Sequence, residues 1–218
     1  CVKACIRNFP KVTKLQVQLH PKDASLGTKC VLTGPEILLD ADDVTDLKCG
    51  ETITLMGWGN MKVNSIVSGT TIDCVILDAD LGNKDFRKTK KLNWLCVPSA
   101  PHRIPGSTRI PVICVYFDHL ISKPKLSPDD DFKEFARHKT RFEFTMIGER
   151  AMAAIKKGEI IQLQRRGFFI CDQPYSQSSK SVGLKAPCVL FNIPDGSTKE
   201  SPTSLMTVRR RLAQKKAK

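Results

Sequence analysis

Short runs in which apolar and polar residues alternate are the feature of this sequence that most restricts its fold. Leu15, Val17 and Leu19, for example, alternate with Gln16 and Gln18. Further runs of this kind occupy residues 53–56, 71–78, 92–97, 110–116, 141–146, 159–164, 167–171 and 187–193. Successive side chains of a β-strand point to opposite faces, so a period of two indicates half-buried strands. So many short runs, separated by Gly, Pro, Asn and Asp, predict an all-β sandwich or barrel.

Helical periodicity is scarce, and only two segments are predicted to form short helices, residues 129–136 (DDDFKEFA) and 150–157 (RAMAAIKK). The acidic triplet Asp129, Asp130 and Asp131 suggests a magnesium site. Acids are also typical of the first turn of a helix, where they interact favourably with the helix dipole. We therefore interpret the triplet as a solvated helix N-terminus rather than as a metal site.

With 218 residues, the chain can form one large domain or two small ones around a real core. No apolar run approaches the roughly 20 residues that span a bilayer. Residues 1–10 also lack the apolar region of a secretory signal. A start at Cys1 rather than at a methionine suggests a segment of a longer protein.

The nine cysteines are scattered, odd in number and never spaced as CxxC. Several lie inside strand-like runs, among them Cys74 and Cys114, so we expect free, buried thiols in the reducing cytoplasm. The four histidines lie far apart and form no HExxH motif, so no metal site is expected. The phosphate-binding patterns GxGxxG and GxxxxGK[ST] and the nucleophile-elbow pattern GxSxG are missing too. We therefore assign no catalytic residue, metal or cofactor to this chain.

The chain is basic, with 35 Lys and Arg against 22 Asp and Glu and a net charge of +13. Six of these excess charges follow Glu200, in a stretch without acids, and the body keeps the other seven. A basic body favours a polyanionic partner, with nucleic acid first and an acidic membrane second. From residue 197 the chain becomes polar and then basic, which predicts a solvated tail or, alternatively, an arm that contacts RNA.

The densest basic run of the body is predicted to face the phosphate backbone of a nucleic acid, with a solvated charged loop as the alternative. The run consists of Lys84, Arg87, Lys88, Lys90 and Lys91.

Residues 158–172 (GEIIQLQRRGFFICD) predict a β-hairpin that turns at 165–167 and gathers amides and guanidinium groups at one corner. Along its first strand Gln162 and Gln164 point away from the apolar side. A carboxamide offers a donor beside an acceptor, which is the pattern that reads the edge of an unpaired base, and a guanidinium adds fixed donors. Phe168 and Phe169 would supply a core ring and a stacking platform. The alternative interpretation is that these Gln and Arg side chains merely occupy the exposed face of an edge strand.

Several stretches resemble the C-terminal anticodon-binding region of eukaryotic glutamyl-tRNA synthetases, including the glutamyl half of the bifunctional glutamyl-prolyl enzymes. The resemblance runs from about residue 12 to 196, in the family's order. Its motifs are HPKDASLGTK (20–29), GETITLMGWGN (50–60), DFRKTKKLNWL (85–95), DHLISKPKLSPDDDFKEF (118–135) and the hairpin. Glutaminyl relatives share HPK and the QxxR hairpin, whereas WGN and KKxxWL favour the glutamyl branch.

The resemblance implies two antiparallel β-barrels that grip the anticodon end of a tRNA. Approximately residues 33–97 would form one barrel, 12–32 with 98–196 the other, and 197–218 a basic tail or linker. The QxxR match assigns an anticodon-base contact to Gln162 and Arg165. Because residues three apart face oppositely in a flat strand, Arg165 is expected in the turn or on a bulge, where it can join Gln162.

Three departures from the family pattern matter. Residues 1–12 fit poorly, so we expect a divergent end there. Only residues 44–49 connect the acidic pair Asp42–Asp43 to Gly50, so the base contacts of the longer glutaminyl loop do not transfer. HIGH-like and KMSKS-like sequences are missing from this chain, and SKPKL (122–126) is interpreted as a barrel connection rather than as the lysine loop.

The resulting hypothesis is a tRNA anticodon-binding module of a cytosolic glutamate–tRNA ligase. The full enzyme would use ATP and Mg²⁺ to join glutamate to its tRNA, whereas this chain alone would need no cofactor and would be inactive. One alternative is a non-catalytic scaffold domain that contacts other synthetases of a complex. A glutaminyl-type anticodon module and an unrelated nucleic-acid-binding barrel are two more. A membrane partner is not expected.

Overall fold

The computed structural model describes residues 1–20, 22–69, 72–97, 109–178 and 185–194. β-Strands dominate these residues, which confirms the predicted all-β class. The described residues divide into two compact units. The first takes its residues from Cys1–Arg109 and Glu149–Ala151, and the second from Ile110–Gly148 and the segment after Ala151. Within the described ranges, no helix has the length and apolar character needed to cross a membrane.

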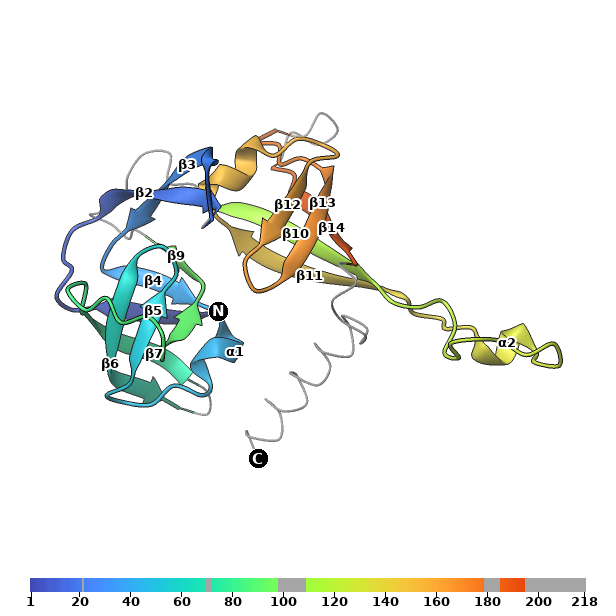
Figure 1. Cartoon of the computed structure of the whole chain (residues 1–218), viewed down its shortest axis with the longest axis horizontal. Coiled ribbons are helices and arrows are strands. Elements are labelled where there is room, and N and C mark those ends of the chain that lie inside the picture. Colours follow the sequence, from blue (N-terminus) through green and yellow to red (C-terminus); the bar gives the residue numbers. More distant parts are fainter. Residues whose placement is uncertain (21, 70–71, 98–108, 179–184, 195–218) are drawn as a thin grey trace. The chain divides into compact units, whose positions relative to one another are not determined.

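A seven-stranded sheet in the order β8-β5-β6-β7-β1-β4-β9 forms the centre of the first unit. Its strands are β1 (Val2–Ile6), β4 (Glu36–Leu39), β5 (Thr52–Leu55), β6 (Gly59–Ser68), β7 (Ile72–Ala79), β8 (Lys90–Leu92) and β9 (Trp94–Cys96). The two edge strands, β8 and β9, are separated in sequence only by Asn93. A single residue cannot bridge the width of a flat sheet, so the sheet curls until its edges approach each other (Figure 1).

The inward positions of these strands fill the first core. Ile53, Leu55, Met61 and Leu77 are all completely buried, and burying a side chain of this size contributes roughly 1.5–3 kcal/mol. Short helix α1 (Ala41–Val44) adds the fully buried Val44. The alternation that predicted a strand at 71–78 thus places Val75 and Leu77 in the core, whereas in β5 Thr54, between Ile53 and Leu55, is buried as well.

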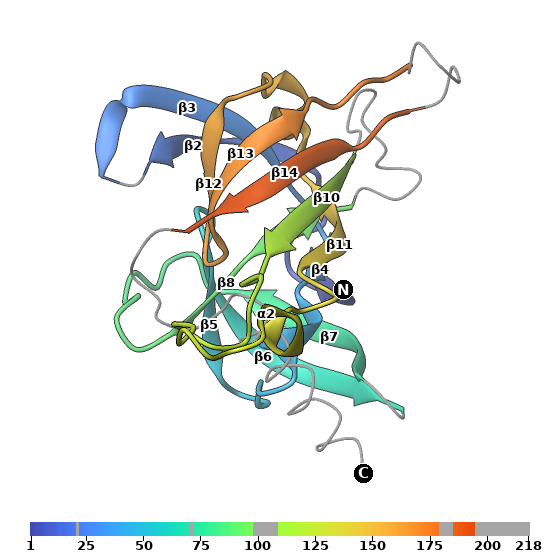
Figure 2. The same ribbon diagram turned by 90° about the vertical axis from the view of Figure 1, so that its right-hand side faces the viewer.

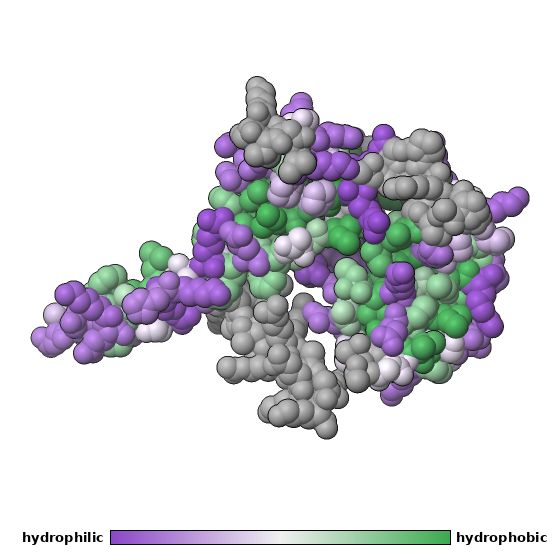
Figure 3. All heavy atoms as spheres, turned by 180° about the vertical axis from the view of Figure 1, so that it is seen from behind, coloured by the Kyte–Doolittle hydropathy of each residue, from purple (hydrophilic) through white to green (hydrophobic). Residues whose placement is uncertain are grey.

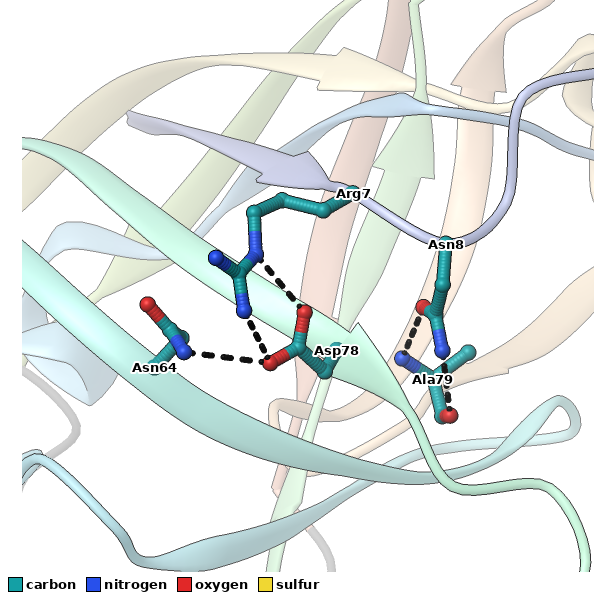
Figure 4. A network of polar contacts seen from close by, with 5 residues as sticks. All are labelled: Arg7, Asn8, Asn64, Asp78 and Ala79. Carbon is teal, nitrogen blue, oxygen red and sulfur yellow. Dashed lines mark hydrogen bonds and ion pairs between the residues drawn. The ribbon is translucent and has the colours of Figure 1, made fainter.

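The first residues of the chain are an integral part of this sheet. Strand β1 lies between β7, to which it is parallel, and β4, to which it is antiparallel, and it buries Ala4 and Ile6. Just beyond β1, Arg7 donates from Nε and Nη2 to the two carboxylate oxygens of Asp78, at 2.9 and 2.7 Å (Figure 4). Asn8 exchanges two hydrogen bonds with the backbone of Ala79, at 2.6 and 3.0 Å. Residues 2–8 are therefore built into the first unit.

A separate hairpin of two longer strands, β2 (Thr13–His20) and β3 (Asp23–Thr33), also groups with the first unit by its contacts. It contains the predicted alternating run from Leu15 to Leu19. Near its base, the hydroxyls of Thr13 and Thr33 lie 2.6 Å apart, and Thr33 is buried. The division into two barrels implied by the family resemblance, with 12–32 in the second barrel, stays a prediction.

The second unit contains a five-stranded sheet in the order β11-β10-β14-β13-β12. Its strands are β10 (Ile110–Phe117), β11 (Arg141–Gly148), β12 (Ile160–Leu163), β13 (Gly167–Gln173) and β14 (Cys188–Ile193). One face buries Cys114, Phe169 and Leu190 completely. The ring of Phe169 meets the ring of Tyr116 edge to face, with centroids 5.6 Å apart. Figure 2 shows β12, β13 and β14 side by side, with a tight turn between the first two.

The connection between β10 and β11 extends away from this sheet and carries helix α2 (Phe132–Phe135) (Figure 1). The Asp131 carboxylate caps the helix by accepting from the backbone N–H of Lys133 at 2.9 Å, so an acid of the triplet does open a helix, as predicted. The SKPKL stretch lies on this arm, where Lys123 pairs with Asp130 at 2.5 Å. Hydrophilic residues cover most of the arm in Figure 3.

The second predicted helix differs from expectation. Residues 150–154 form a 3₁₀ helix, η1 (Arg150–Ala154), and the chain leaves it before the predicted end at 157. Gly158, with a φ of 83°, then begins the approach to β12. The predicted basic tail, 197–218, lies outside the described residues.

All nine cysteines are free, as expected, but their burial is mixed. Cys96, Cys114, Cys171 and Cys188 are buried, whereas Cys74 is half-buried. Cys1, Cys5, Cys30 and Cys49 are exposed, so the expectation of burial is wrong for these four. Burial raises the pKa of the Cys96 thiol to about 11 and that of Cys114 to about 12. These two thiols therefore remain protonated and behave as small apolar groups.

Candidate nucleic-acid interface

The hairpin of β12 and β13 turns within three residues. The strands pair up to Leu163 and Gly167, and the N–H of Arg166 donates to the carbonyl of Leu163 at 2.9 Å to close the turn. Arg165 therefore sits in the turn, as its spacing from Gln162 requires. Its φ is 65°, which makes it the only residue with a side chain in the left-handed region among those the structure describes.

A second hairpin, between β5 and β6, repeats this turn and shows which residue it ordinarily takes. There the N–H of Trp58 donates to the carbonyl of Leu55 at 3.0 Å, and Leu55 pairs with Gly59. The residue that corresponds to Arg165 is Gly57, with a φ of 77°. A residue with a Cβ in this conformation costs roughly 1–2 kcal/mol. The hairpin thus keeps an arginine where its counterpart has a glycine, and such strain is typical of functional positions.

The outer face of the same hairpin brings an amide and an aromatic ring together. Gln162 is exposed and lies directly opposite Phe168 in the strand register. Side chains opposite each other in an antiparallel pair have Cβ atoms about 5 Å apart. Phe168 is 39% exposed, while the adjacent Phe169 is fully buried. Of the two rings predicted to supply a core ring and a stacking platform, Phe169 lies in the core, and the ring of Phe168 is accessible.

The chemistry of this face matches a splayed base. An exposed carboxamide can donate to one atom of a base edge and accept from the next, and an aromatic face can stack on the base. Arg165 and Gln164 in the turn are exposed too. The base-contact roles of Gln162 and Arg165 stay predictions.

The basic run of the first unit divides into two groups. Lys90 donates from Nζ to the carbonyl of Asp46 at 2.5 Å and lies 3.3 Å from Glu51 Oε1. Lys91 donates to the carbonyls of Phe86 and Thr89. These two ammonium groups have partners within the chain, so they are less available for phosphate than their position in the sequence suggests.

The other three basic residues, Lys84, Arg87 and Lys88, are exposed in the loop between β7 and β8. Within the described ranges, no acid forms an ion pair with their side chains. The backbone-contact role of all five residues in the run stays a prediction, and the geometry favours these three.

Sequence analysis missed two features of this loop. The ring of Phe86 stands between the basic residues and is 38% exposed. An aromatic residue inside a basic run (KDFRK) is a recognised signal for nucleic-acid binding and would have identified it. Asn60, which belongs to the WGN motif, is completely buried and bonds to the loop. No local pattern distinguishes it from an ordinary turn asparagine.

Among the described residues, no group of three or more His, Cys, Asp or Glu side chains is placed so that it could hold a metal ion.

Taken together, the fold and its surface define an all-β protein of two units that displays polar and aromatic groups at a strained hairpin turn and in a basic loop. Comparison with known families identifies both units. Residues 1–81 and residues 102–172 each match a model described as the anticodon-binding domain of class I tRNA synthetases for E and Q. The chain therefore belongs to the anticodon-binding domains of class I glutamyl- and glutaminyl-tRNA synthetases. The first match begins at residue 1, in agreement with the central position of β1, so the expectation of a divergent end at residues 1–12 is wrong.

Individual relatives are glutamate enzymes. The bifunctional glutamate/proline–tRNA ligase of Drosophila melanogaster is 49% identical over 203 residues, which are 91% of this chain and 11% of that protein. The bifunctional ligase of Cricetulus griseus is 43% identical over 191 residues, 87% of this chain and 12% of that protein. The cytoplasmic glutamate–tRNA ligase of Arabidopsis thaliana is 34% identical over 177 residues, 81% and 23% respectively. The chain thus spans at most a quarter of the length of these relatives.

Proposed function

We propose that this chain is the anticodon-binding module of a cytoplasmic glutamate–tRNA ligase and that it binds the anticodon end of glutamate tRNA. The observation that carries the proposal is the hairpin of β12 and β13. There, within the residues that match the anticodon-binding family, this chain holds Arg165 in a conformation that suits glycine, at the turn next to the exposed pair of Gln162 and Phe168.

The hairpin chemistry suits uracil, the middle base that glutamate and glutamine anticodons share. The amide of Gln162 donates to O4 and accepts from N3–H, and the guanidinium of Arg165 donates to a carbonyl or a phosphate. A good bidentate contact to a base contributes roughly 1–3 kcal/mol of discrimination. Because the two tRNAs share this base, the hairpin separates them from tRNAs whose middle anticodon base is not uracil, and not from each other.

The basic loop supplies affinity rather than selectivity. Lys84, Arg87 and Lys88 are exposed on one loop, and each phosphate that they neutralise releases counterions. Affinity for tRNA therefore falls as the salt concentration rises. These contacts are indifferent to sequence, because the phosphate backbone is the same in every tRNA.

The activity of the whole protein is proposed from its relatives. Joining glutamate to tRNA would be carried out by another part of the parent enzyme, which would bind ATP and Mg²⁺, while this chain needs neither. Relatives are named cytoplasmic, which supports the same location here. The bifunctional relatives also support a parent with a second synthetase activity and with other synthetases as partners.

The test is a set of dissociation constants for the chain with three RNAs: glutamate tRNA, the same tRNA with its middle anticodon base changed from U to C, and an unrelated tRNA. We expect the tightest binding to glutamate tRNA and about tenfold or more weaker binding to the single-base variant. Equal affinity for all three would overturn the anticodon function. Together with binding to another synthetase, that result would favour the scaffold alternative.

A further inference from the structure

We propose that Asn60 is a positioning residue for tRNA binding, whose buried carboxamide holds the basic loop between β7 and β8 in its binding shape. The inference rests on the proposed function of that loop. It concerns a residue that lies beneath the binding surface and contacts no RNA itself.

The hydrogen bonds of Asn60 point at the loop. Its Nδ2 donates to the carbonyl oxygens of Asn83, at 3.2 Å, and of Asp85, at 2.9 Å. Its Oδ1 accepts from the hydroxyl of Thr54 at 2.6 Å. A carboxamide has two N–H donors, and both are used for loop carbonyls that flank Lys84.

The far end of the loop is held by the same pair of strands. The hydroxyl of Thr54 on β5 lies 2.5 Å from that of Thr89, the last loop residue before β8. Thr54 and Asn60 are opposite each other in the β5–β6 register and are both buried. One buried polar pair therefore attaches the loop at two points, before and after Arg87 and Lys88.

Hydrogen bonds within the loop also order its backbone. The side chain of Asn83 accepts from the N–H of Asp85 at 3.0 Å, and the side chain of Asp85 accepts from the N–H of Arg87 at 3.1 Å. These local turns shape the backbone, but they do not fix it to the sheet. The attachment to the sheet comes from Asn60, Thr54 and, at the end of the loop, Lys91.

Gly59, the neighbour of Asn60, lies close to the same loop. A Cβ at this position would lie 2.8 Å from Cδ2 of Leu81, the loop residue that packs against the core, and its φ is 150°. Gly59 thus leaves room for Leu81 of the loop, and Asn60 binds the loop by hydrogen bonds. This gives the GN pair of the WGN motif a physical role.

If the loop is held in one shape before binding, less conformational entropy is lost when tRNA binds, and the affinity is higher. The test is a double-mutant cycle that crosses Asn60→Leu, which keeps the number and branching of the side-chain heavy atoms and removes the amide, with the triple change Lys84→Ala, Arg87→Ala and Lys88→Ala. We expect Asn60→Leu to weaken binding of glutamate tRNA by about threefold to tenfold in the native chain. In the triple variant it should change the affinity by less than about twofold, because the groups that it positions are gone.

Two further variants separate positioning from stability. Thr33→Val removes a buried hydroxyl of the same unit at a site whose partner is Thr13, away from the loop, so it should lower stability and leave tRNA affinity unchanged. Thr89→Val removes the second attachment and provides the same cycle if Asn60→Leu fails to fold.

The outcomes distinguish the inference from the function on which it rests. Equal losses from Asn60→Leu in both backgrounds, no loss in the native chain, or an equal loss from Thr33→Val would overturn the positioning role and leave the function of the loop intact. If the triple variant binds as tightly as the native chain, the proposed function of the loop fails, and the inference fails with it.

Discussion

Replacing Arg165 by asparagine should stabilise the protein relative to alanine while it removes a tRNA contact. Arg165 has a φ of 65° in the turn of the β12–β13 hairpin. Alanine keeps the Cβ and therefore the strain of roughly 1–2 kcal/mol, whereas asparagine tolerates the left-handed region. Both substitutions remove the guanidinium and its contacts, so their difference isolates the backbone. We expect Arg165→Asn to exceed Arg165→Ala by about 1 kcal/mol in the free energy of unfolding.

The assay is urea unfolding of the two variants, followed by circular dichroism, with thermal unfolding in parallel. A difference of 1 kcal/mol corresponds to about 2–4 °C in Tm for a chain of this size. Arg165→Gly also relieves the strain, but its gain should be smaller, because glycine adds roughly 0.5–1 kcal/mol of backbone entropy to the unfolded state.

The β5–β6 hairpin offers a matched control. Gly57→Ala places a Cβ at a φ of 77° with its closest neighbour, Val17 Cγ1, at 3.4 Å, so the change adds backbone strain without a clash. It should lower the free energy of unfolding by up to about 1 kcal/mol, because the smaller backbone entropy of the unfolded alanine variant offsets part of the added strain. Equal stability of Arg165→Asn and Arg165→Ala would refute the strain argument. If both variants keep the native affinity for tRNA, the guanidinium of Arg165 does not contribute to tRNA binding, and the backbone strain has no function there.

Three other predictions concern the rest of the chain. The guanidinium of Arg7 holds the pKa of the Asp78 carboxyl below its ordinary value of 3.8. The ion pair therefore stabilises the fold above that pH, and the stabilisation is lost as the pH falls through the lowered pKa. The difference in free energy of unfolding between the native chain and Asp78→Asn, measured with urea, should be constant from about pH 7 to 5 and shrink in more acidic buffer. The triple alanine change at Lys84, Arg87 and Lys88 should weaken binding to all tRNAs alike and reduce the slope of log affinity against log salt by roughly two to three, whereas an unchanged slope would assign these residues to solvent. The chain alone should catalyse no glutamate-dependent exchange between ATP and pyrophosphate, and exchange above background would contradict its assignment as a non-catalytic module.

Local patterns predicted most of the strands, because the alternation of a strand records which side chains face the core, but they predicted none at β1, β3, β4 or β6. The strand β10, for instance, follows the alternating run at 110–116, and the hairpin of β12 and β13 turns where its polar corner indicated. The order of strands could not be predicted in this way. The parallel pairs β1–β7 and β5–β8 join segments far apart in sequence, and no local pattern encodes which strands meet.

Only part of the candidate site could be predicted, because local patterns do not encode contacts between segments that are far apart in sequence. Gln162 and Arg165 were found through a short motif, whose parts lie within one hairpin. The run of basic residues could not show that Lys90 and Lys91 bind their own chain, since their partners depend on the folded loop. Asn60 was missed because its role arises from carbonyl groups more than twenty residues further along the chain.

The central claim is that the hairpin reads the middle base of the anticodon, and a binding cycle tests it most directly. The cycle crosses Gln162→Ala with a U-to-C change at that base in glutamate tRNA, with Gln16→Ala, an exposed strand glutamine of the other unit, as the control. We predict that Gln162→Ala lowers the affinity for native tRNA about tenfold or more, to that of the changed tRNA, and leaves the affinity for the changed tRNA nearly constant. If the two losses instead combine independently, Gln162 does not read that base, and the hairpin is only an exposed edge of the sheet.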